Sequence, residues 1–199
     1  MKTQKQQACR RSKRAHEAIL AATLELIEQR GYLGLSIEGI AACAGVGKQT
    51  IYRWWPTKAA LVIEAYSQKS TDYLQSPDTG SVKNDLEVLL TAIFTRISAP
   101  PSSHVITGLV AESQNNPELA AQFHRVFLKG RRELVIELIE KGITRGEVNP
   151  EIDMEIAADS LFGPMWYRLL IRHTPLDQNF AKQLVRQTLA GMSASSEEK

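Results

Sequence analysis

The chain has 199 residues, of which 43% are hydrophobic and 23% are charged, and its formal net charge is +2. This composition is typical of a soluble globular protein with one large or two small domains. No segment approaches the roughly 18 uncharged apolar residues of a membrane span, and the N-terminus lacks the apolar run of a signal peptide. Cys9 and Cys43 fit neither a C-x-x-C pair nor a disulfide framework, so the expected compartment is the reducing cytoplasm, with no membrane partner.

The charge is divided unevenly along the chain. Residues 1–66 contain ten Lys and Arg against five Asp and Glu, whereas residues 67–199 contain fourteen against seventeen. The first segment is therefore suited to meet phosphates and the second is not. The basic residues that precede the first acidic one are Lys2, Lys5, Arg10, Arg11, Lys13 and Arg14. They form either a disordered solubilising tail or an arm that lies along a nucleic-acid backbone or in its minor groove.

The first predicted helix covers about residues 14–30. Its apolar residues recur at the spacing of one helix face, and Gly31 follows as a stop signal. The residues of this face are Ile19, Ala22, Leu26 and Ile27. The spacing predicts an amphipathic helix with one buried side.

Residues 36–61 have the layout of a helix-turn-helix, two short helices that pack at a steep angle across a tight turn. Ser36 is a favourable N-cap for the first helix, and Gly45 supplies the left-handed backbone conformation that ends it. Ala41 is small where the two helices come closest. The apolar sides consist of Ile37, Ile40 and Ala41 in the first helix and Val46, Ile51 and Trp55 in the second. These agreeing features favour a DNA-reading motif over a chance pair of amphipathic helices.

The outer face of the second helix carries side chains that suit DNA. At about 100° per residue, Gln49 and Arg53 lie nearly opposite the buried Ile51. The flanks of this face are Thr50 and Tyr52, and its first turn, which usually points at base edges, holds Lys48. Lys and Arg suit guanine, Gln suits adenine, a Thr methyl suits thymine, and the tyrosine is placed to bond a phosphate. The alternative interpretation is a solvated polar face without a ligand.

The rest of the chain is predicted to be helical, because no stretch shows sustained period-two alternation. Thr57 caps the first of these helices, and prolines and glycines separate the others. The expected helices cover residues 58–75, 81–98, 102–114, 117–145, 152–172 and 177–191. Glu137 and Lys141 have ion-pair spacing and indicate a solvated helix face. The predicted fold is all-α, with a helix-turn-helix domain and basic arm at 1–66 and a second helical domain at 67–199.

Residues 14–66 resemble the DNA-binding domain of the tetracycline-repressor (TetR) family of bacterial regulators. The family pattern is a helix ending in Gly-Tyr/Phe, then Ser/Thr-hydrophobic-x-x-Ile-Ala-x-x-Ala-Gly-Val, then Thr-hydrophobic-Tyr-x-x-Phe-x-x-Lys-x-x-Leu. The matching segments here are Gly31-Tyr32, Ser36-Ile37-Glu38-Gly39-Ile40-Ala41, Ala44-Gly45-Val46, Thr50-Ile51-Tyr52, Lys58 and Leu61. Trp55 replaces the usual Phe and is expected in the core. Trp54 replaces a polar residue or His, and either packs or contacts a phosphate.

Motif and resemblance together predict a set of DNA contacts and their partner. The expected contacts are Ser36, Lys48, Gln49, Thr50, Tyr52, Arg53, Trp54 and Lys58. The expected partner is a double-stranded DNA operator. Two recognition helices of a dimer would lie about 34–36 Å apart and match successive major grooves of a palindromic site.

The second half carries more apolar and aromatic side chains than thin helices need. A plain bundle core accounts for them, whereas the resemblance implies a small-molecule pocket and dimerisation through the last two long helices. Candidate pocket residues are Phe94, His104, Leu109, Phe123, Phe127, Phe162 and Trp166, and candidate dimer residues are Leu161, Leu169, Phe180, Leu184 and Leu189. Gly163-Pro164 inside a predicted helix is expected to kink it and to shape either the pocket or the dimer seam.

Catalysis is not expected from this sequence. Residues 45–50 superficially resemble a phosphate-binding loop, but Ala42 stands where G-x-x-x-x-G-K-[ST] needs its first glycine, and Gln49 follows the lysine. The histidines, His16, His104, His124 and His173, are isolated in the sequence and lack metal-ligand spacing. His104 and His124 could polarise a ligand, although surface or satisfied core histidines are the more common case. No metal and no cofactor are expected.

The predicted function is that of a cytoplasmic, homodimeric, one-component transcription regulator. Repression is the expected mode, with an unidentified small-molecule effector that favours a dimer whose DNA-binding heads are wrongly spaced. Effector and DNA would then oppose each other through one reciprocal coupling energy. Two alternatives stay open: a small-molecule-binding or interaction protein without operator binding, and a DNA-binding regulator without an inducer.

Overall fold

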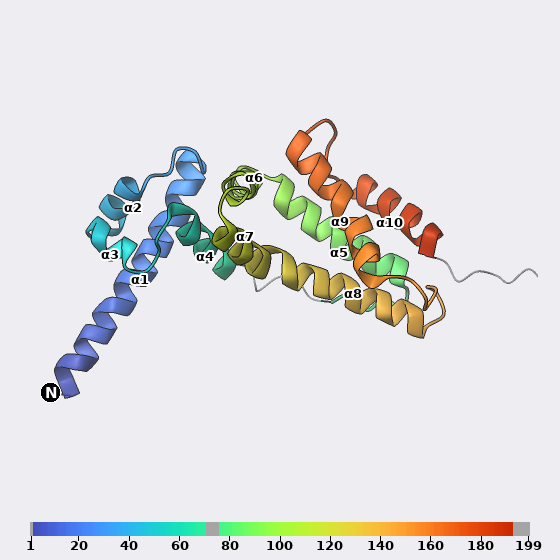
Figure 1. Ribbon diagram of the computed structural model, residues 1–199, viewed down its shortest axis with the longest axis horizontal. Coiled ribbons are helices and arrows are strands. Elements are labelled where there is room, and N and C mark those ends of the chain that lie inside the picture. The colour runs from blue at the N-terminus through green and yellow to red at the C-terminus, as the bar shows by residue number, and fades with distance from the viewer. Residues whose placement is uncertain (1, 71–75, 193–199) are drawn as a thin grey trace, which may run out of the picture. The chain divides into compact units, whose positions relative to one another are not determined.

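In the part of the chain that the structure describes, every element of regular secondary structure is a helix (Figure 1). This computed structural model describes the backbone of residues 2–70 and 76–192, and the side chains of residues 12–67 and 76–192. Its elements are α1 (Lys2–Arg30), α2 (Ile37–Ala44), α3 (Lys48–Tyr52), α4 (Lys58–Ser70), α5 (Val82–Ser98), α6 (Ser102–Ser113), α7 (Pro117–Phe123), the π-helical turn η1 (His124–Leu128), α8 (Lys129–Thr144), α9 (Met154–Ile171) and α10 (Gln178–Met192). The predicted all-α class is confirmed.

The helices fall into two compact units. The first combines residues 1–72 with 104–126, and the second combines 73–103 with 127–199. The first unit therefore contains α1 to α4, most of α6, and α7, and the second contains α5, α8, α9 and α10. The sequence-based division into domains at 1–66 and 67–199 stays a prediction.

α1 is the longest helix of the first unit and packs against α2 and α4. Its apolar stripe, which includes Ile19 and Ile27, is buried, and Gly31 ends it with a φ of 68° as predicted. The helix begins at Lys2 and not at about residue 14, because residues 2–13 contain no Gly or Pro and are rich in the good helix formers Lys, Gln and Arg. Four members of the predicted basic arm lie outside the described side chains: Lys2, Lys5, Arg10 and Arg11.

The turn between α2 and α3 has the predicted local geometry. Ser36 Oγ accepts a hydrogen bond from the backbone N–H of Gly39 at 3.1 Å and so caps α2. Gly45 adopts a φ of 65°, and the N–H of Val46 donates to the carbonyl of Ala41 at 3.0 Å, which closes the C-terminus of α2. The buried residues of the motif are Ile37, Ile40, Ala41, Ile51 and Trp55, whereas Val46 is half-buried.

Side-chain caps also start α4 and α7. Thr57 Oγ1 accepts from the N–H of Ala60 at 3.1 Å, and Asn116 Oδ1 accepts from the N–H of Leu119 at 3.1 Å. α4 packs against α1 and α7. Its predicted continuation over residues 71–75 lies outside the described residues.

The predicted helix over 117–145 contains a π-helical turn. The chain stays helical from Pro117 to Thr144, but η1 widens one turn between α7 and α8. A π turn inserts a residue without a Gly or Pro signal, so hydrophobic spacing alone does not reveal it. Phe123 and Phe127, on either side of the start of this turn, are both buried.

The second unit contains α5, α8, α9 and α10. α5 packs against α8 and α10, and α9 packs against the same two helices. The carboxylate of Asp153 caps α9 by accepting from the N–H of Ile156 at 3.0 Å. Pro164 lies inside α9, which continues past it to Ile171, and the predicted kink stays a prediction. Within the described ranges, none of the helices combines the length and apolarity that crossing a bilayer requires.

Candidate nucleic-acid interface

The exposed face of α3 is the one predicted from helical spacing. Ile51 is completely buried, whereas Lys48, Gln49, Tyr52 and Arg53 on the other sides are exposed. Thr50, on the predicted flank, is half-buried. The structure thus brings together a compact polar surface of two cations, one amide and one phenol at the second helix of the motif.

A five-residue helix needs support from its surroundings, because isolated helices of this length do not form in water. Two residues anchor α3: Ile51, at 0% exposure, and Trp55, at 2%. The N–H groups of Trp54 and Trp55 both donate to the carbonyl of Ile51 at 2.9 Å, which ends the helix in a tight turn. The helix is therefore anchored from its buried side, while the side chains of its polar face remain accessible.

An aromatic cluster joins the end of α3 to α1 and α4. The His16 ring stacks on Trp55, with centroids 4.8 Å apart, and meets Trp54 edge-on at the same distance. Glu64 completes the cluster: one carboxylate oxygen lies 3.0 Å from His16 Nε2, and the other accepts from Trp55 Nε1 at 2.8 Å. His16, isolated in the sequence, is therefore a contact residue of the folded motif.

Trp54 both packs and stays partly exposed, and its predicted phosphate contact stays a prediction. Its ring packs against His16, yet 42% of the residue remains exposed. The Arg53 guanidinium carbon lies 5.9 Å from the Trp54 ring centroid, at the outer limit of a cation–π contact. Sequence reasoning missed His16 and Glu64 because they come from other helices, and no spacing rule links them to α3.

Lys48 forms an ion pair that the sequence did not indicate. Its Nζ lies 3.0 Å from Oε1 of Glu38, which belongs to α2, and both side chains are more than half exposed. The hydrogen bond between them lowers the pKa of Glu38 and raises the pKa of Lys48, so both groups are charged at neutral pH. The opposite charges of the two residues were the only sequence signal for this pair. That signal was not sufficient, because contacts between residues of two different helices follow no fixed sequence spacing.

Lys58, a predicted phosphate contact, is half-buried. Its Nζ lies 4.4 Å from the centroid of the Tyr32 ring, 3.4 Å from the Tyr32 carbonyl and 3.9 Å from Glu112 of α6. Burial raises the pKa of Tyr32, and the negative charge of Glu112 raises it further. Gly108 of α6 faces the same ring closely, because a Cβ there would lie 2.8 Å from Tyr32 Cε1. Within the first unit, α6 is thus fitted against Tyr32.

The predicted pocket residues are distributed over both units. Phe94, Phe127 and Phe162 are buried in the second unit, where Trp166 is half-buried. Leu109 and Phe123 are buried in the first unit, and His104 is exposed there. Phe94 stacks on Phe180 at a centroid distance of 5.6 Å. Their assignment to a ligand pocket stays a prediction.

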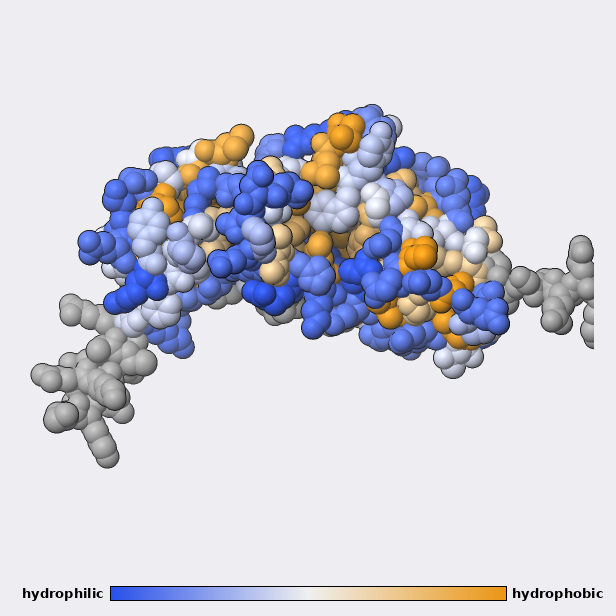
Figure 2. Space-filling model, in the orientation of Figure 1, coloured by the Kyte–Doolittle hydropathy of each residue, from blue (hydrophilic) through white to orange (hydrophobic). Residues whose placement is uncertain are grey.

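The predicted dimer residues are mostly inside the second unit. Leu161, Leu169 and Leu184 are buried within the single chain, and Phe180 and Leu189 are half-buried. Most of the exposed large apolar residues described in this unit lie on α9 and are Ile156, Tyr167, Leu170 and Ile171, at 45% to 65% exposure, whereas Val88 lies on α5. Figure 2 shows hydrophobic surface over α9 in agreement with this. Helical periodicity identified two apolar faces but did not say which one the chain itself covers.

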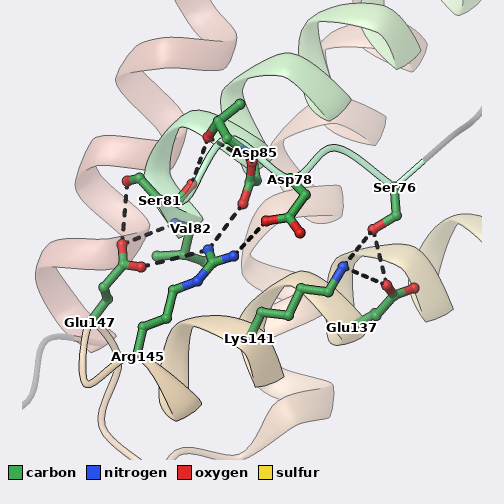
Figure 3. A network of polar contacts seen from close by, with 10 residues as sticks. Ser76, Asp78, Ser81, Val82, Asp85, Glu137, Lys141, Arg145 and Glu147 are labelled. Carbon is green, nitrogen blue, oxygen red and sulfur yellow. Dashed lines mark hydrogen bonds and ion pairs between the residues drawn. The ribbon is translucent and has the colours of Figure 1, made fainter.

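A polar network ties the start of α5 to the end of α8 (Figure 3). Arg145 lies at its centre, with Nη1 3.3 Å from Asp85 Oδ2 and Nη2 2.7 Å from Asp78 Oδ1. The Asp85 side chain is fully buried and accepts from both the N–H and the hydroxyl of Thr79, at 2.6 and 2.7 Å. Burial alone raises the pKa of Asp85, but the hydrogen bonds from Thr79 and Arg145 outweigh it and hold the pKa below its ordinary value. This network of Asp78, Thr79, Asp85 and Arg145 has a structural role, and we call it the polar clasp.

The described side chains contain no group of three or more His, Cys, Asp or Glu residues arranged to hold a metal ion. The ion pair of Glu137 with Lys141, at 2.8 Å, confirms the helix-surface pairing predicted from their spacing.

Comparisons with known proteins agree with this geometry. Residues 19–65 match the family model of the bacterial regulatory proteins of the tetR family, and residues 76–188 match that of the tetracyclin repressor-like C-terminal domain. The HTH-type transcriptional regulator YdeS of Bacillus subtilis is 34% identical over 186 residues, which cover 94% of this chain and 93% of that protein.

Solved structures show the same fold. The crystal structure of the TetR family transcription regulator SCO0332 is 32% identical, with a TM-score of 0.74 over 90% of this chain and 99% of that one. The transcriptional regulator FadR of Bacillus subtilis, solved in complex with stearoyl-CoA, is 20% identical, with a TM-score of 0.69 over 88% of this chain and 98% of that one. The chain belongs to the TetR family of bacterial transcriptional regulators.

Proposed function

We propose that the protein is a one-component repressor that binds a palindromic operator as a homodimer and leaves it when a small-molecule effector binds. In this proposal residues 1–66 bind DNA, residues 67–199 bind the effector and dimerise, and the protein acts in the cytoplasm without catalysis of its own. The observation that carries the proposal is the outer face of α3, where Lys48, Gln49 and Tyr52 are exposed on a helix anchored from behind.

The proposed DNA contacts fall into two groups according to their position along α3. Lys48 and Gln49 stand in the first turn of α3, which enters the major groove first, so we assign them to base edges. Tyr52 and Arg53 follow one turn later and are assigned to phosphates, which fix register but carry no base identity. The remaining proposed contacts are Ser36, Thr50, Trp54 and Lys58. Of these, Lys58 must give up contacts with Tyr32 and Glu112 to reach a phosphate.

The outward face of α9 supports the homodimer. Exposed residues recur along it at alternating steps of four and three: Ile156, Ser160, Gly163, Tyr167 and Leu170. This spacing is that of a seam between two packed helices. Small residues at its middle allow close approach, and a Cβ built on Gly163 meets nothing within 4 Å in the single chain. We place the two-fold contact on this seam, with Leu161 and Leu169 supporting it from inside.

The effector is proposed to bind among the aromatic residues of the second unit, including Phe94, Phe162 and Trp166. FadR of Bacillus subtilis, which shares the fold, was solved with stearoyl-CoA. A long-chain acyl-CoA is therefore a sensible first probe. A bound ligand at 100 times its Kd adds about 2.7 kcal/mol of stability, which thermal denaturation detects.

The test is a binding selection from random duplexes with the full chain, followed by titration of the selected site at several salt concentrations. The proposal predicts an enriched palindrome whose half-sites are about one helical turn, or a multiple of it, apart. It also predicts an affinity that falls with salt, by a slope of about −0.9 for each phosphate neutralised. No enriched sequence would overturn operator binding and favour an interaction protein.

A further inference from the structure

The contact between Glu38 and Lys48 has no evident structural purpose. Glu38 is the second residue of α2 and Lys48 is the first residue of α3, so the pair bridges the two helices of the motif at their N-terminal ends. Exposed ion pairs contribute little to folding stability. A carboxylate in the first turn does suit the dipole of α2, but this preference requires no partner on α3.

A carboxylate beside a helix that reads DNA is repelled by every phosphate it faces, because the two strands carry closely spaced negative charges. The carboxylate therefore weakens the binding of the protein to DNA. It also holds the ammonium group of Lys48, which would otherwise be available to a phosphate. The position of Glu38 therefore lowers affinity for DNA in general. On the correct sequence this cost is offset where the carboxylate itself finds a hydrogen-bond donor.

The major-groove edge of a G·C pair offers the matching chemistry. It presents two acceptors, guanine N7 and O6, followed by one donor, the cytosine N4 amino group. An ammonium suits the first two and an adjacent carboxylate suits the third. An A·T pair also presents an acceptor beside a donor, adenine N7 and the N6 amino group. It offers the ammonium one acceptor before that donor, where a G·C pair offers two, and its far side carries the thymine O4 acceptor and a methyl group.

We propose that Glu38 and Lys48 act as one reading unit for a G·C pair, or for a guanine and a cytosine in adjacent pairs. Lys48 donates to guanine, and Glu38 accepts from cytosine N4. Glu38 is then a specificity-determining residue outside the recognition helix, and it also suppresses binding to unrelated DNA. This inference rests on the proposed function, because it requires α3 to enter the major groove.

The experiment compares the full-length wild type with Glu38→Gln, Lys48→Met and the double variant. Glu133→Gln is the matched control, because Glu133 pairs with Lys129 in an equally exposed ion pair on α8, at 3.7 Å. Each protein undergoes binding selection, and affinity for the selected site and for an unrelated duplex is measured at several salt concentrations. Thermal denaturation records the fold of each variant.

For Glu38→Gln, the preference for cytosine at one position of each half-site falls by about 5- to 150-fold, the discrimination that one good base contact provides. Affinity for the unrelated duplex rises, and the salt slope becomes steeper by about 0.9 as Lys48 gains a phosphate. Lys48→Met weakens the preference for the adjacent guanine. The double variant shows no greater loss of preference for cytosine than Glu38→Gln alone. Glu133→Gln changes neither selection nor slope.

Two results would overturn the inference while leaving operator binding intact. One is an unchanged selected sequence for Glu38→Gln together with a changed one for Lys48→Met, which would make lysine the only reader. The other is an equal loss of affinity for all sequences on Glu38→Gln, which would assign Glu38 to maintaining the fold of the motif. A wild type that selects no sequence would instead overturn the proposed function.

Discussion

The helix-turn-helix and the second unit are both all-helical, but they differ in how directly sequence determines the exposed surface. In the motif, a serine cap, a left-handed glycine and the buried Ile51 and Trp55 fix the turn and α3, and the side of α3 opposite Ile51 is exposed. In the second unit, α9 carries apolar residues around most of its circumference, and only packing decides that Leu169 is covered while Leu170 is exposed. Local signals therefore determine the exposed face of α3, which we propose to read DNA. The exposed face of α9, which we propose to form the dimer, depends instead on which neighbouring helices cover the rest of α9.

The largest expected effect is loss of the dimer when a charge is placed on the exposed face of α9. Leu170→Glu places two like charges across the proposed two-fold seam, so we expect dissociation of the dimer. Operator affinity then falls by about 10²- to 10⁴-fold, because the two half-sites are no longer bound together. Sedimentation equilibrium and operator titration measure both effects.

Val88→Glu is the control for this prediction. Val88 is 53% exposed on α5, a helix that contributes none of the proposed seam residues, so the same change of charge should leave the dimer intact. Equal dissociation by both substitutions, or by neither, would contradict the assignment of the seam.

The next effect concerns the polar clasp of the second unit. Asp85→Ala leaves Arg145 without its buried partner and Thr79 without its acceptor, and should cost about 3 kcal/mol of stability. Glu137→Ala, which breaks an exposed pair with Lys141, should cost less than about 1 kcal/mol. Denaturant titration of both variants measures the contrast, and equal costs would show that the clasp is not structural.

The pH dependence of the clasp follows from the lowered pKa of Asp85. The folded state favours the ionised carboxylate, so its contribution is fully present above the ordinary value of 3.8. That contribution is lost as pH falls from 3.8 through the lower pKa of the folded state. The wild type should therefore lose more stability than Asp85→Asn across this acid range, and parallel losses would contradict the assigned shift.

A smaller effect tests the fit of α6 against Tyr32. Gly108→Ala forces a methyl group into the ring and should cost about 1–3 kcal/mol. Gly130→Ala, also in a helix but with nothing within 4 Å of its Cβ, should instead stabilise by about 0.5–1 kcal/mol. The opposite signs are readable by thermal denaturation, and stabilisation by both would show that the contact is loose.

The smallest effect lies in the aromatic cluster behind α3. Glu64→Ala leaves the indole N–H of the buried Trp55 without its acceptor and should cost about 1–2 kcal/mol. Glu133→Ala on the surface of α8 should change stability by less than about 0.5 kcal/mol. Denaturant titration measures the loss of stability in both variants. Equal losses would show that Glu64 does not stabilise the packing behind α3.

Residues with strong local preferences made the fold predictable. Ser36, Gly45, Thr57 and Asn116 each mark a helix boundary that the structure places where the sequence indicates it. The π-helical turn η1 was not predictable, because no residue type or spacing distinguishes it from an ordinary turn. The early start of α1 was missed because polar helix formers carry no apolar periodicity.

The candidate site was predictable only where it lies on one helix. Lys48 and Gln49 follow from the 3.6-residue period, whereas Glu38, His16 and Glu64 reach α3 through tertiary contacts between helices. The sequence did not predict which face of α9 is covered, for the same reason. That face depends on packing against α8 and α10, and no local sequence rule gives the position of these helices.

The most direct test of the central claim, that the outer face of α3 reads DNA, is a binding selection on wild type, Gln49→Ala and Tyr52→Phe. The account predicts a palindrome for the wild type and relaxed preference at one or two positions of each half-site for Gln49→Ala. Tyr52→Phe should select the wild-type sequence with lower affinity, because a phosphate contact carries no base identity. Identical selected sequences for the wild type and Gln49→Ala, or no selected sequence for the wild type, would contradict it.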